Sequence, residues 1–129
     1  MAALLNKIKA DVKDEKVFLA HVSFPLSAEC AYTFPLDVDK ENYLIEDLQK
    51  SYDKLFSVEI MEAIKDFSEN DLQVSLDEDG IINGFMMSLN FSKMIEMQGA
   101  DSVKDEWAVV FTFHIENGDY MLMCIQAVS

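Results

Sequence analysis

The C-terminal part of the chain constrains the fold most strongly. Residues 107–128 read WAVVFTFHI, ENGD and YMLMCIQAV, which are two apolar runs joined by a polar tetrapeptide. Asn117-Gly118 is the strongest short hairpin signal, because both residues tolerate the positive φ angles of a type I′ turn. A two-residue loop would place Glu116 opposite Asp119. The segment therefore predicts a long antiparallel β-hairpin at the end of the chain.

The register of this hairpin predicts which side chains share a face. It pairs Phe113 with Leu122, Phe111 with Cys124 and Val109 with Gln126. One face then carries Trp107, Val109, Phe111, Phe113, Ile115, Tyr120, Leu122, Cys124, Gln126 and Val128. The other carries Ala108, Val110, Thr112, His114, Met121, Met123, Ile125 and Ala127. Because both faces are largely apolar, we expect the hairpin to be central in a sheet.

Helical patterns come before the strands. Residues 2–11 and 15–22 can form two short helices, and a third pattern begins at Lys40. Apolar residues on one face of this third helix recur at three- and four-residue spacing: Leu44, Ile45, Leu48, Tyr52, Leu55 and Phe56. Ser57 is a candidate N-cap for a fourth helix, whose apolar stripe would be Ile60, Met61, Ile64 and Phe67.

After Asn70 the hydrophobic period changes to two. Alternation predicts strands at 72–76 and 85–91, with Asp-Glu-Asp-Gly at 77–80 as the turn between them. The polar stretch 98–105 separates the second strand from the terminal hairpin. We therefore expect a single α+β domain over residues 1–129, with N-terminal helices packed on one face of an antiparallel sheet.

The charge inventory restricts the possible partners. The chain has 24 acidic residues against 10 basic ones, all of them lysine, for a net charge of −14. This charge repels nucleic acid and anionic membranes, so we expect a basic protein partner instead. Residues 37–79 hold 14 acids and 4 lysines, a net charge of −10. The candidate partner-binding residues are Glu46, Asp47, Asp53, Glu59, Glu62, Asp66, Asp77, Glu78 and Asp79.

The sequence offers little for catalysis or metal binding. No phosphate-binding glycine loop, nucleophile elbow or zinc motif occurs, and the two histidines and two cysteines are far apart. We therefore predict no catalytic residue, metal or cofactor. His114 lies near Glu116 and is a candidate base, but a solvated His on a strand is the simpler interpretation. A structural role is the simpler interpretation of His21 too.

The sequence also bears on compartment and redox state. The opening MAALLNKIKA has no long apolar core, and no stretch approaches the ~20 apolar residues of a membrane span. We expect a soluble protein, cytoplasmic as it stands and extracytoplasmic if a leader has been removed. Two reduced thiols, Cys30 and Cys124, fit the sequence better than a disulfide between them.

Several short motifs are similar to those of one superfamily. They are Phe24-Pro25-Leu26, Tyr52-Asp53-Lys54-Leu55-Phe56, Ala63-Ile64 and Gly80-Ile81-Ile82 through Gly84. Over residues 15–92 this succession resembles the NTF2-like and cystatin-like α+β superfamily, and most closely bacterial domains of unknown function. The chain departs from their Gly-x-Gly and Trp-Phe pattern at residues 83–86. The resemblance implies a cone with a curved sheet, and this fold hosts enzymes, ligand binders, inhibitors and assembly modules.

A ligand pocket is one hypothesis that the resemblance suggests. NTF2-like enzymes typically use a pocket between sheet and helices. If the aromatic face of the hairpin lines such a pocket, Tyr120 and Gln126 are candidates to orient a ligand, with Trp107 and Phe111 beside them. That face carries no carboxylate, so a catalytic base would have to come from the helices.

Two classes of function remain open from the sequence. The first is a small acidic interaction protein without enzymatic activity, such as a bacterial toxin-immunity protein or a nucleic-acid mimic, with a homodimer through the sheet as a further possibility. The alternative is an NTF2-like small-ligand binder or enzyme of unknown substrate, or an uncharacterised extracytoplasmic domain. Salt-sensitive binding of a partner favours the first class, and a small molecule that co-purifies favours the second.

Overall fold

The computed structural model describes residues 1–27, 42–95 and 103–128. Its helices are α1 (Ala2–Asp11), α2 (Glu15–Leu19), α3 (Ile45–Leu55), α4 (Val58–Asp66) and the short 3-10 helix η1 (Glu69–Asp71). Its strands are β1 (Leu26–Ser27), β2 (Asn42–Tyr43), β3 (Gln73–Leu76), β4 (Ile82–Ile95), β5 (Val103–Glu116) and β6 (Asp119–Val128). The chain is therefore α+β, with the helices first and long strands last, as predicted.

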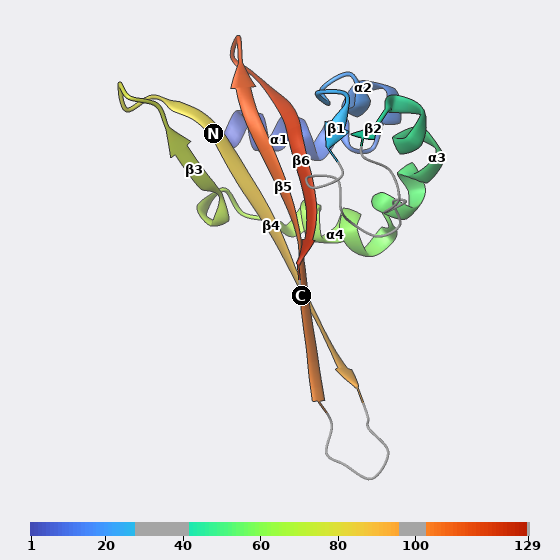
Figure 1. Cartoon of the computed structure of the whole chain (residues 1–129). Coiled ribbons are helices and arrows are strands. Elements are labelled where there is room, and N and C mark those ends of the chain that lie inside the picture. Colours follow the sequence, from blue (N-terminus) through green and yellow to red (C-terminus); the bar gives the residue numbers. More distant parts are fainter. Residues whose placement is uncertain (28–41, 96–102, 129) are drawn as a thin grey trace.

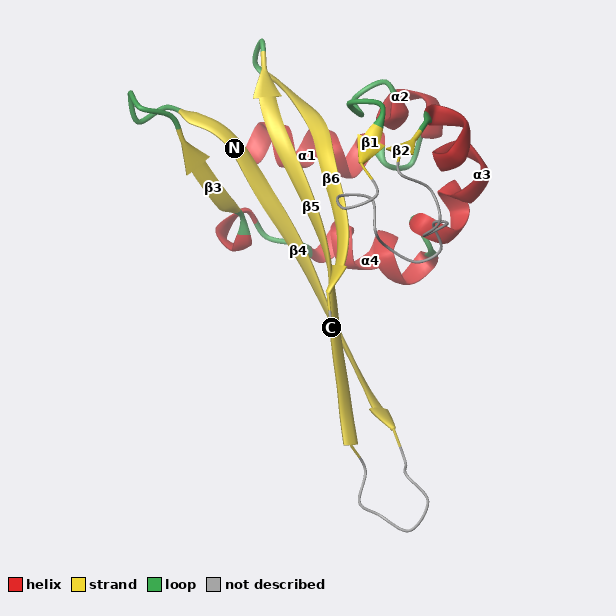
Figure 2. Ribbon diagram, viewed as in Figure 1, coloured by secondary structure: helices red, strands yellow, loops and turns green. Residues whose placement is uncertain are grey.

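The long strands form one meandering antiparallel sheet. Its order is β3-β4-β5-β6, while β1 and β2 form a separate two-stranded ribbon (Figure 2). In Figure 1 α1 passes behind the sheet, and the face toward the viewer has no helix in front of it. The buried residues of the helices and of the sheet belong to a single core cluster. The helices therefore cover one face of the sheet, as the sequence predicted.

The terminal hairpin has the predicted turn but a different register beyond it. Asn117 and Gly118 have φ angles of 52° and 78°, which agrees with a type I′ turn. Phe113 lies opposite Leu122, as expected. One extra residue of β6, Met123, then interrupts the ladder, so Thr112 lies opposite Cys124.

This β-bulge makes two of the predicted pairs wrong. Phe111 lies opposite Ile125 rather than Cys124, and Val109 lies opposite Ala127 rather than Gln126. An inserted residue reverses the alternation of side chains beyond it. Ile125 therefore lies on the helix-covered face, in the position that the predicted register assigns to Cys124.

Two strands of the sheet extend further than expected. β4 and β5 pair from Gly84 opposite His114 as far as Ile95 opposite Val103, although the sequence predicts a strand only to residue 91 and a polar break up to 105. β6 ends opposite Ala108, and β3 pairs only with the start of β4. The far ends of β4 and β5, residues 91–95 and 103–107, therefore form a two-stranded arm that projects beyond the helices (Figure 1).

The helix boundaries follow local hydrogen bonds. Ser57 caps α4 as predicted, since its Oγ accepts from the Ile60 N–H at 3.4 Å. The third helix begins at Ile45 rather than near Lys40, because Asn42–Tyr43 is the strand β2, which pairs with β1. α2 ends at Leu19, three residues before the predicted end. The second Phe-Pro-Leu copy, at 34–36, and Cys30 lie outside the described residues.

Two buried tyrosine hydroxyls hold the C-terminal end of α1. The Tyr52 hydroxyl of α3 donates to the Val12 carbonyl at 2.6 Å, and the Tyr120 hydroxyl of β6 donates to Asp11 Oδ2 at 2.7 Å. Burial raises the pKa of Tyr52 well above its ordinary value, and nearby Glu15 adds to this effect. Burial and the bond to Asp11 raise the pKa of Tyr120 in the same direction. Both hydroxyls therefore remain protonated donors at physiological pH.

The bond from Tyr52 predicts a measurable loss of stability when its hydroxyl is removed. Tyr52→Phe keeps the ring but leaves the Val12 carbonyl without this donor in a buried position. We expect the free energy of unfolding in urea to fall by about 1–3 kcal/mol, which is the cost of an unsatisfied buried polar group. A loss below about 0.5 kcal/mol, the lower end for a net hydrogen bond, would contradict this role.

Candidate functional site

The exposed carboxylates of α3 and α4 are the first candidate for a binding surface. Glu46, Asp53, Glu59, Glu62 and Asp66 are all exposed. The amphipathic pattern turns them outward, since the opposite faces of these helices are buried in the core. None of the five forms an ion pair with another residue in the described part of the chain. Their charge is thus not neutralised by a described neighbour.

Two of the other predicted acids have structural hydrogen bonds. Asp47 Oδ2 accepts from the Leu44 N–H at 2.9 Å at the start of α3. Asp77 Oδ1 accepts from the N–H groups of Asp79 and Ile81 at 2.9 and 3.0 Å, which shapes the β3–β4 turn. These bonds satisfy backbone donors at a helix start and in a turn.

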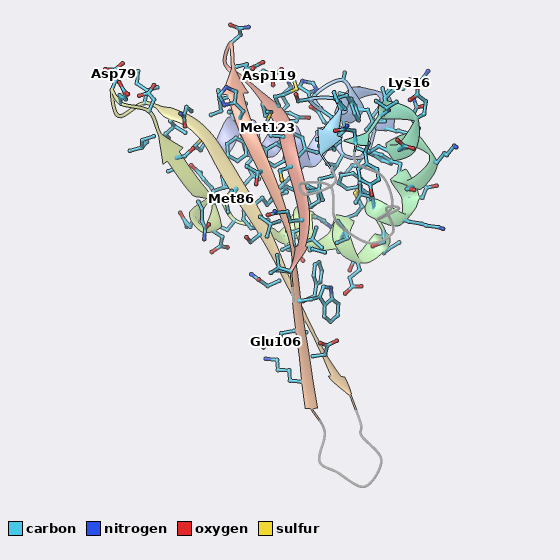
Figure 3. All side chains as sticks on the ribbon, in the orientation of Figure 1. Lys16, Asp79, Met86, Glu106, Asp119 and Met123 are labelled. Carbon is cyan, nitrogen blue, oxygen red and sulfur yellow. The ribbon has the colours of Figure 1, made fainter. Side chains whose placement is uncertain are left out.

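The nine predicted acids do not form one patch. The turn 77–80 with Glu78 and Asp79 lies at the far edge of the sheet from α3, as the label of Asp79 in Figure 3 shows. The structure therefore divides them into a helical group on α3 and α4 and a separate turn. The helical group is the larger one.

Of the four predicted pocket residues, Trp107 lies beside a cavity that the described part of the chain forms. The side chains of Tyr120 and Phe111 are 1% and 0% exposed and belong to the core. Gln126 is exposed and lies opposite Val110, on the sheet face that the helices leave uncovered. The bulge at Met123 causes this separation, because it turns Gln126 away from Phe111.

Trp107 forms a half-buried aromatic pair with Phe91 where the arm leaves the sheet. The two residues are directly opposed on β5 and β4, and their ring centroids are 5.7 Å apart. They line a groove of about 310 Å³ between the arm and the junction of α3 and α4. Its other lining residues include Lys54, Leu55, Glu59 and Ile60. We call this cavity the arm groove.

The lining of the arm groove determines what it can bind. Aromatic and aliphatic side chains form most of its wall, and Lys54 and Glu59 contribute the charge. This combination suits an apolar side chain that has a cationic or polar neighbour. The groove holds no histidine or cysteine, and no cluster able to hold a metal ion occurs among residues 1–27, 42–95 and 103–128.

A second polar cluster joins α1, the end of α2 and β6. Lys7 Nζ lies 2.7 Å from the Asp119 carboxylate, and His21 Nε2 lies 2.9 Å from the same group. His21 Nδ1 is 2.9 Å from the Val17 carbonyl, and the imidazole stacks on Tyr120 with 4.4 Å between ring centroids. Lys7 Nζ also lies 3.4 Å from His21 Nε2, so the lysine, the imidazole and the carboxylate are mutual neighbours.

This cluster has the features of a structural contact. The hydrogen bond from Lys7 is the largest cause that lowers the pKa of Asp119 to about 2, and the Tyr120 N–H and His21 act in the same direction. The carboxylate therefore stays ionised at neutral pH. It links α1 and the end of α2 to the start of β6. No sequence pattern indicates this cluster, because residues 7, 21 and 119 become neighbours only in the folded chain.

The other histidine does not form a hydrogen-bonded dyad with the carboxylate proposed for it. His114 Nε2 is 3.9 Å from Glu116 Oε1, which is longer than a hydrogen bond, and both side chains are about half exposed. This geometry fits a solvated histidine on a strand.

A scan against models of protein families, a search of curated proteins and a search of solved structures each found no match. The resemblance to the NTF2-like and cystatin-like superfamily therefore stays a prediction. In the described part of the chain, no helix is both long and apolar enough to cross a membrane.

The Asp119 cluster predicts how stability depends on acidity. Because the pKa of Asp119 is lower in the folded chain than in the unfolded one, its contribution is complete above about pH 4 and is lost as the pH falls toward 2. Asp119→Asn should remove this part of the dependence. It should also cost about 1 kcal/mol or less at pH 7, since the carboxylate is partly exposed.

The measurement is urea unfolding of both proteins from pH 7 to pH 2. Glu78→Gln is the matched control, because Glu78 is an exposed turn carboxylate in none of the described ion pairs. An Asp119→Asn profile that keeps the slope of the wild type would show that this cluster does not carry the acid sensitivity.

Proposed function

We propose that this chain is a small acidic interaction protein without enzymatic activity, which binds a basic protein partner through α3, α4 and the arm groove. A toxin-immunity protein is the most concrete form of this function. The observation that carries the proposal is a group of five exposed carboxylates on α3 and α4, none in an ion pair with a described residue. One of them, Glu59, lines the arm groove together with the half-buried Trp107.

Electrostatics supports a basic partner. Residues 44–71 hold eight acids and three lysines, for a net charge of −5 on a chain of −14. A cluster of one sign attracts an oppositely charged protein over a distance of about one Debye length and speeds its association. Since no internal ion pair among the described residues has to break first, the carboxylates of α3 and α4 can pair directly with lysine or arginine.

The arm groove supports a specific contact within this charged surface. Trp and Tyr side chains with Arg dominate the binding energy at protein interfaces, usually in a pocket that excludes water. Trp107 and Phe91 provide such an aromatic contact, and Glu59 of α4 lines the same groove. An apolar side chain of the partner would then lie next to the charge of α4.

At the level of the fold, we propose the NTF2-like or cystatin-like cone that the sequence motifs resemble. Helices on one face of a meandering antiparallel sheet support this assignment. Proteins with this fold include inhibitors and assembly modules as well as enzymes, so the fold agrees with a function that is not enzymatic.

A second candidate is a binder of a small apolar ligand. The arm groove, at about 310 Å³, is at the lower end of the volumes of small-molecule sites. A ligand there would contact Trp107. Trp107 fluorescence would therefore respond both to a protein partner and to a small apolar ligand.

The test is capture from a lysate of the source organism on the immobilised protein at low salt, followed by elution in a salt gradient. We expect one basic protein to elute between roughly 0.2 and 0.5 M salt, where screening shortens the Debye length below about 8 Å. The double variant Glu59→Lys/Glu62→Lys should lose this protein, because it reverses the charge of α4 beside the groove.

The matched control is Glu78→Lys/Asp79→Lys, which makes the same change of charge at the distant β3–β4 turn and should keep the protein bound. Trp107 is the only tryptophan, so its fluorescence should change when the captured protein is titrated in. Capture that both double variants weaken equally, or that salt does not affect, would contradict the proposal.

A further inference from the structure

A second groove lies between the end of α1 and helix α4. Its volume is about 290 Å³, at the lower end of the range for small-molecule sites. The apolar part of its lining is formed by Val12, Phe56, Met61 and Ile64, of which all but Met61 are buried. Val58, the first residue of α4, also lines the groove and is 77% exposed, the highest value among the large apolar side chains that the structure describes. Apolar surface is therefore open to solvent at this place.

Three lysines surround this apolar lining, although the chain is strongly acidic. Lys9, Lys13 and Lys65 line the groove with one carboxylate, Glu62, so three positive charges and one negative charge leave a net charge of +2. The whole chain has only ten lysines and a net charge of −14. None of the three forms an ion pair with a carboxylate among residues 1–27, 42–95 and 103–128. We call this cavity the lysine groove.

Lys9 keeps its charge at a fixed place in the lysine groove. Its Nζ donates to the Lys65 carbonyl at 2.9 Å and to the Phe67 carbonyl at 2.6 Å, and its side chain is half-buried. These bonds cap the C-terminal end of α4, where a cation is favourable. Both acceptors are backbone groups without a full charge, so the ammonium is not neutralised. An ammonium has three protons, and the third is not bound by any described residue.

We propose that the lysine groove binds a small amphipathic anion, which has one unbranched apolar chain and one carboxylate. The apolar chain lies along Val12, Phe56 and Met61, and the carboxylate accepts from the ammonium groups that line the groove. An apolar lining with a small number of charged groups is the usual composition of a ligand site. The net charge of the lining selects an anion, and the small volume suits one chain rather than a lipid with two chains.

This site and the proposed partner surface share α4 but attract opposite charges. Glu59 lines the arm groove, while Met61 and Glu62 line the lysine groove. The lysines repel a basic protein, so the partner does not fill this groove. Glu59→Lys/Glu62→Lys should abolish capture of a basic protein, whereas it should bind the anion at least as tightly as the wild type does. The two proposals can therefore fail independently.

The experiment is an NMR titration of the isotope-labelled full chain with octanoate, read from the backbone amide shifts. The matched ligands are octan-1-ol, which has the same chain without the charge, and octyltrimethylammonium, which has the opposite charge. We expect octanoate to bind with a dissociation constant below roughly 1 mM and to shift the amides of residues 9–13 and 56–65. The two matched ligands should bind at least about fivefold more weakly, because they gain nothing from the lysines.

Lys13→Gln/Lys65→Gln removes two exposed charges and should weaken octanoate binding at least about fivefold. Lys9 stays in place, because its bonds hold the end of α4. The matched control is Lys50→Gln/Lys54→Gln, which makes the same change of charge on α3. Neither of these lysines lines the lysine groove, so this variant should bind octanoate like the wild type.

Val58→Asp tests the apolar part of the groove. It replaces an exposed apolar side chain with a carboxylate that repels octanoate, and an acidic residue in the first turn of a helix is compatible with folding. We expect octanoate to bind at least about fivefold more weakly. Ile81→Asp is the matched control, because Ile81 is 64% exposed in the β3–β4 turn and does not line the groove.

Several outcomes would overturn the proposal. They are an absence of shifts at about tenfold the expected dissociation constant, octan-1-ol that binds as tightly as octanoate, and shifts confined to the arm groove. An equal loss of binding in Lys13→Gln/Lys65→Gln and Lys50→Gln/Lys54→Gln would overturn it too. The comparison of octanoate with octan-1-ol uses the wild type alone, so it decides even if the amide spectra show that a variant is unfolded.

Discussion

Phe111 lies at the centre of the sheet with its side chain fully buried, and Phe56 from the end of α3 stacks on it with 5.8 Å between ring centroids. Phe113 and Tyr120 extend this aromatic contact toward α2. The contact joins the helices to one face of the sheet, and the other features depend on it. It places two tyrosine hydroxyls at the end of α1 and turns the acidic sides of α3 and α4 to solvent. The described helices all lie on this one side of the sheet (Figure 1).

The molecule keeps charge and apolar surface apart. Carboxylates gather on the helices and at the strand ends, while the three long strands carry none over the length that the helices cover. The arm groove is the place where the two kinds of surface meet, since Glu59 and Trp107 both line it. Opposite charge would attract a basic protein to the acidic helices, which is the binding surface that we propose.

Periodicity and turn chemistry predicted much of the fold. The Asn117-Gly118 turn, the Ser57 cap and the order of helices and strands follow from local preferences, which the folded chain does not override. The bulge at Met123 could not be predicted, because Leu122, Met123, Cys124 and Ile125 are all apolar and their alternation has no marker. The arm could not be predicted either, since the polar residues 104–106 pair with β4 without a hydrophobic pattern.

The sequence by itself determined the chemistry of each surface: which helix positions are acidic, which strand positions are uncharged, and that no motif for phosphate, metal or a catalytic nucleophile is present. Only the tertiary structure decided which residues lie together. It buried Tyr120 and Phe111, turned Gln126 to the opposite face, set Phe91 beside Trp107, and brought Lys7 and His21 to Asp119. The physical reason is that local patterns report one element at a time, whereas strand register and helix packing join residues a hundred positions apart.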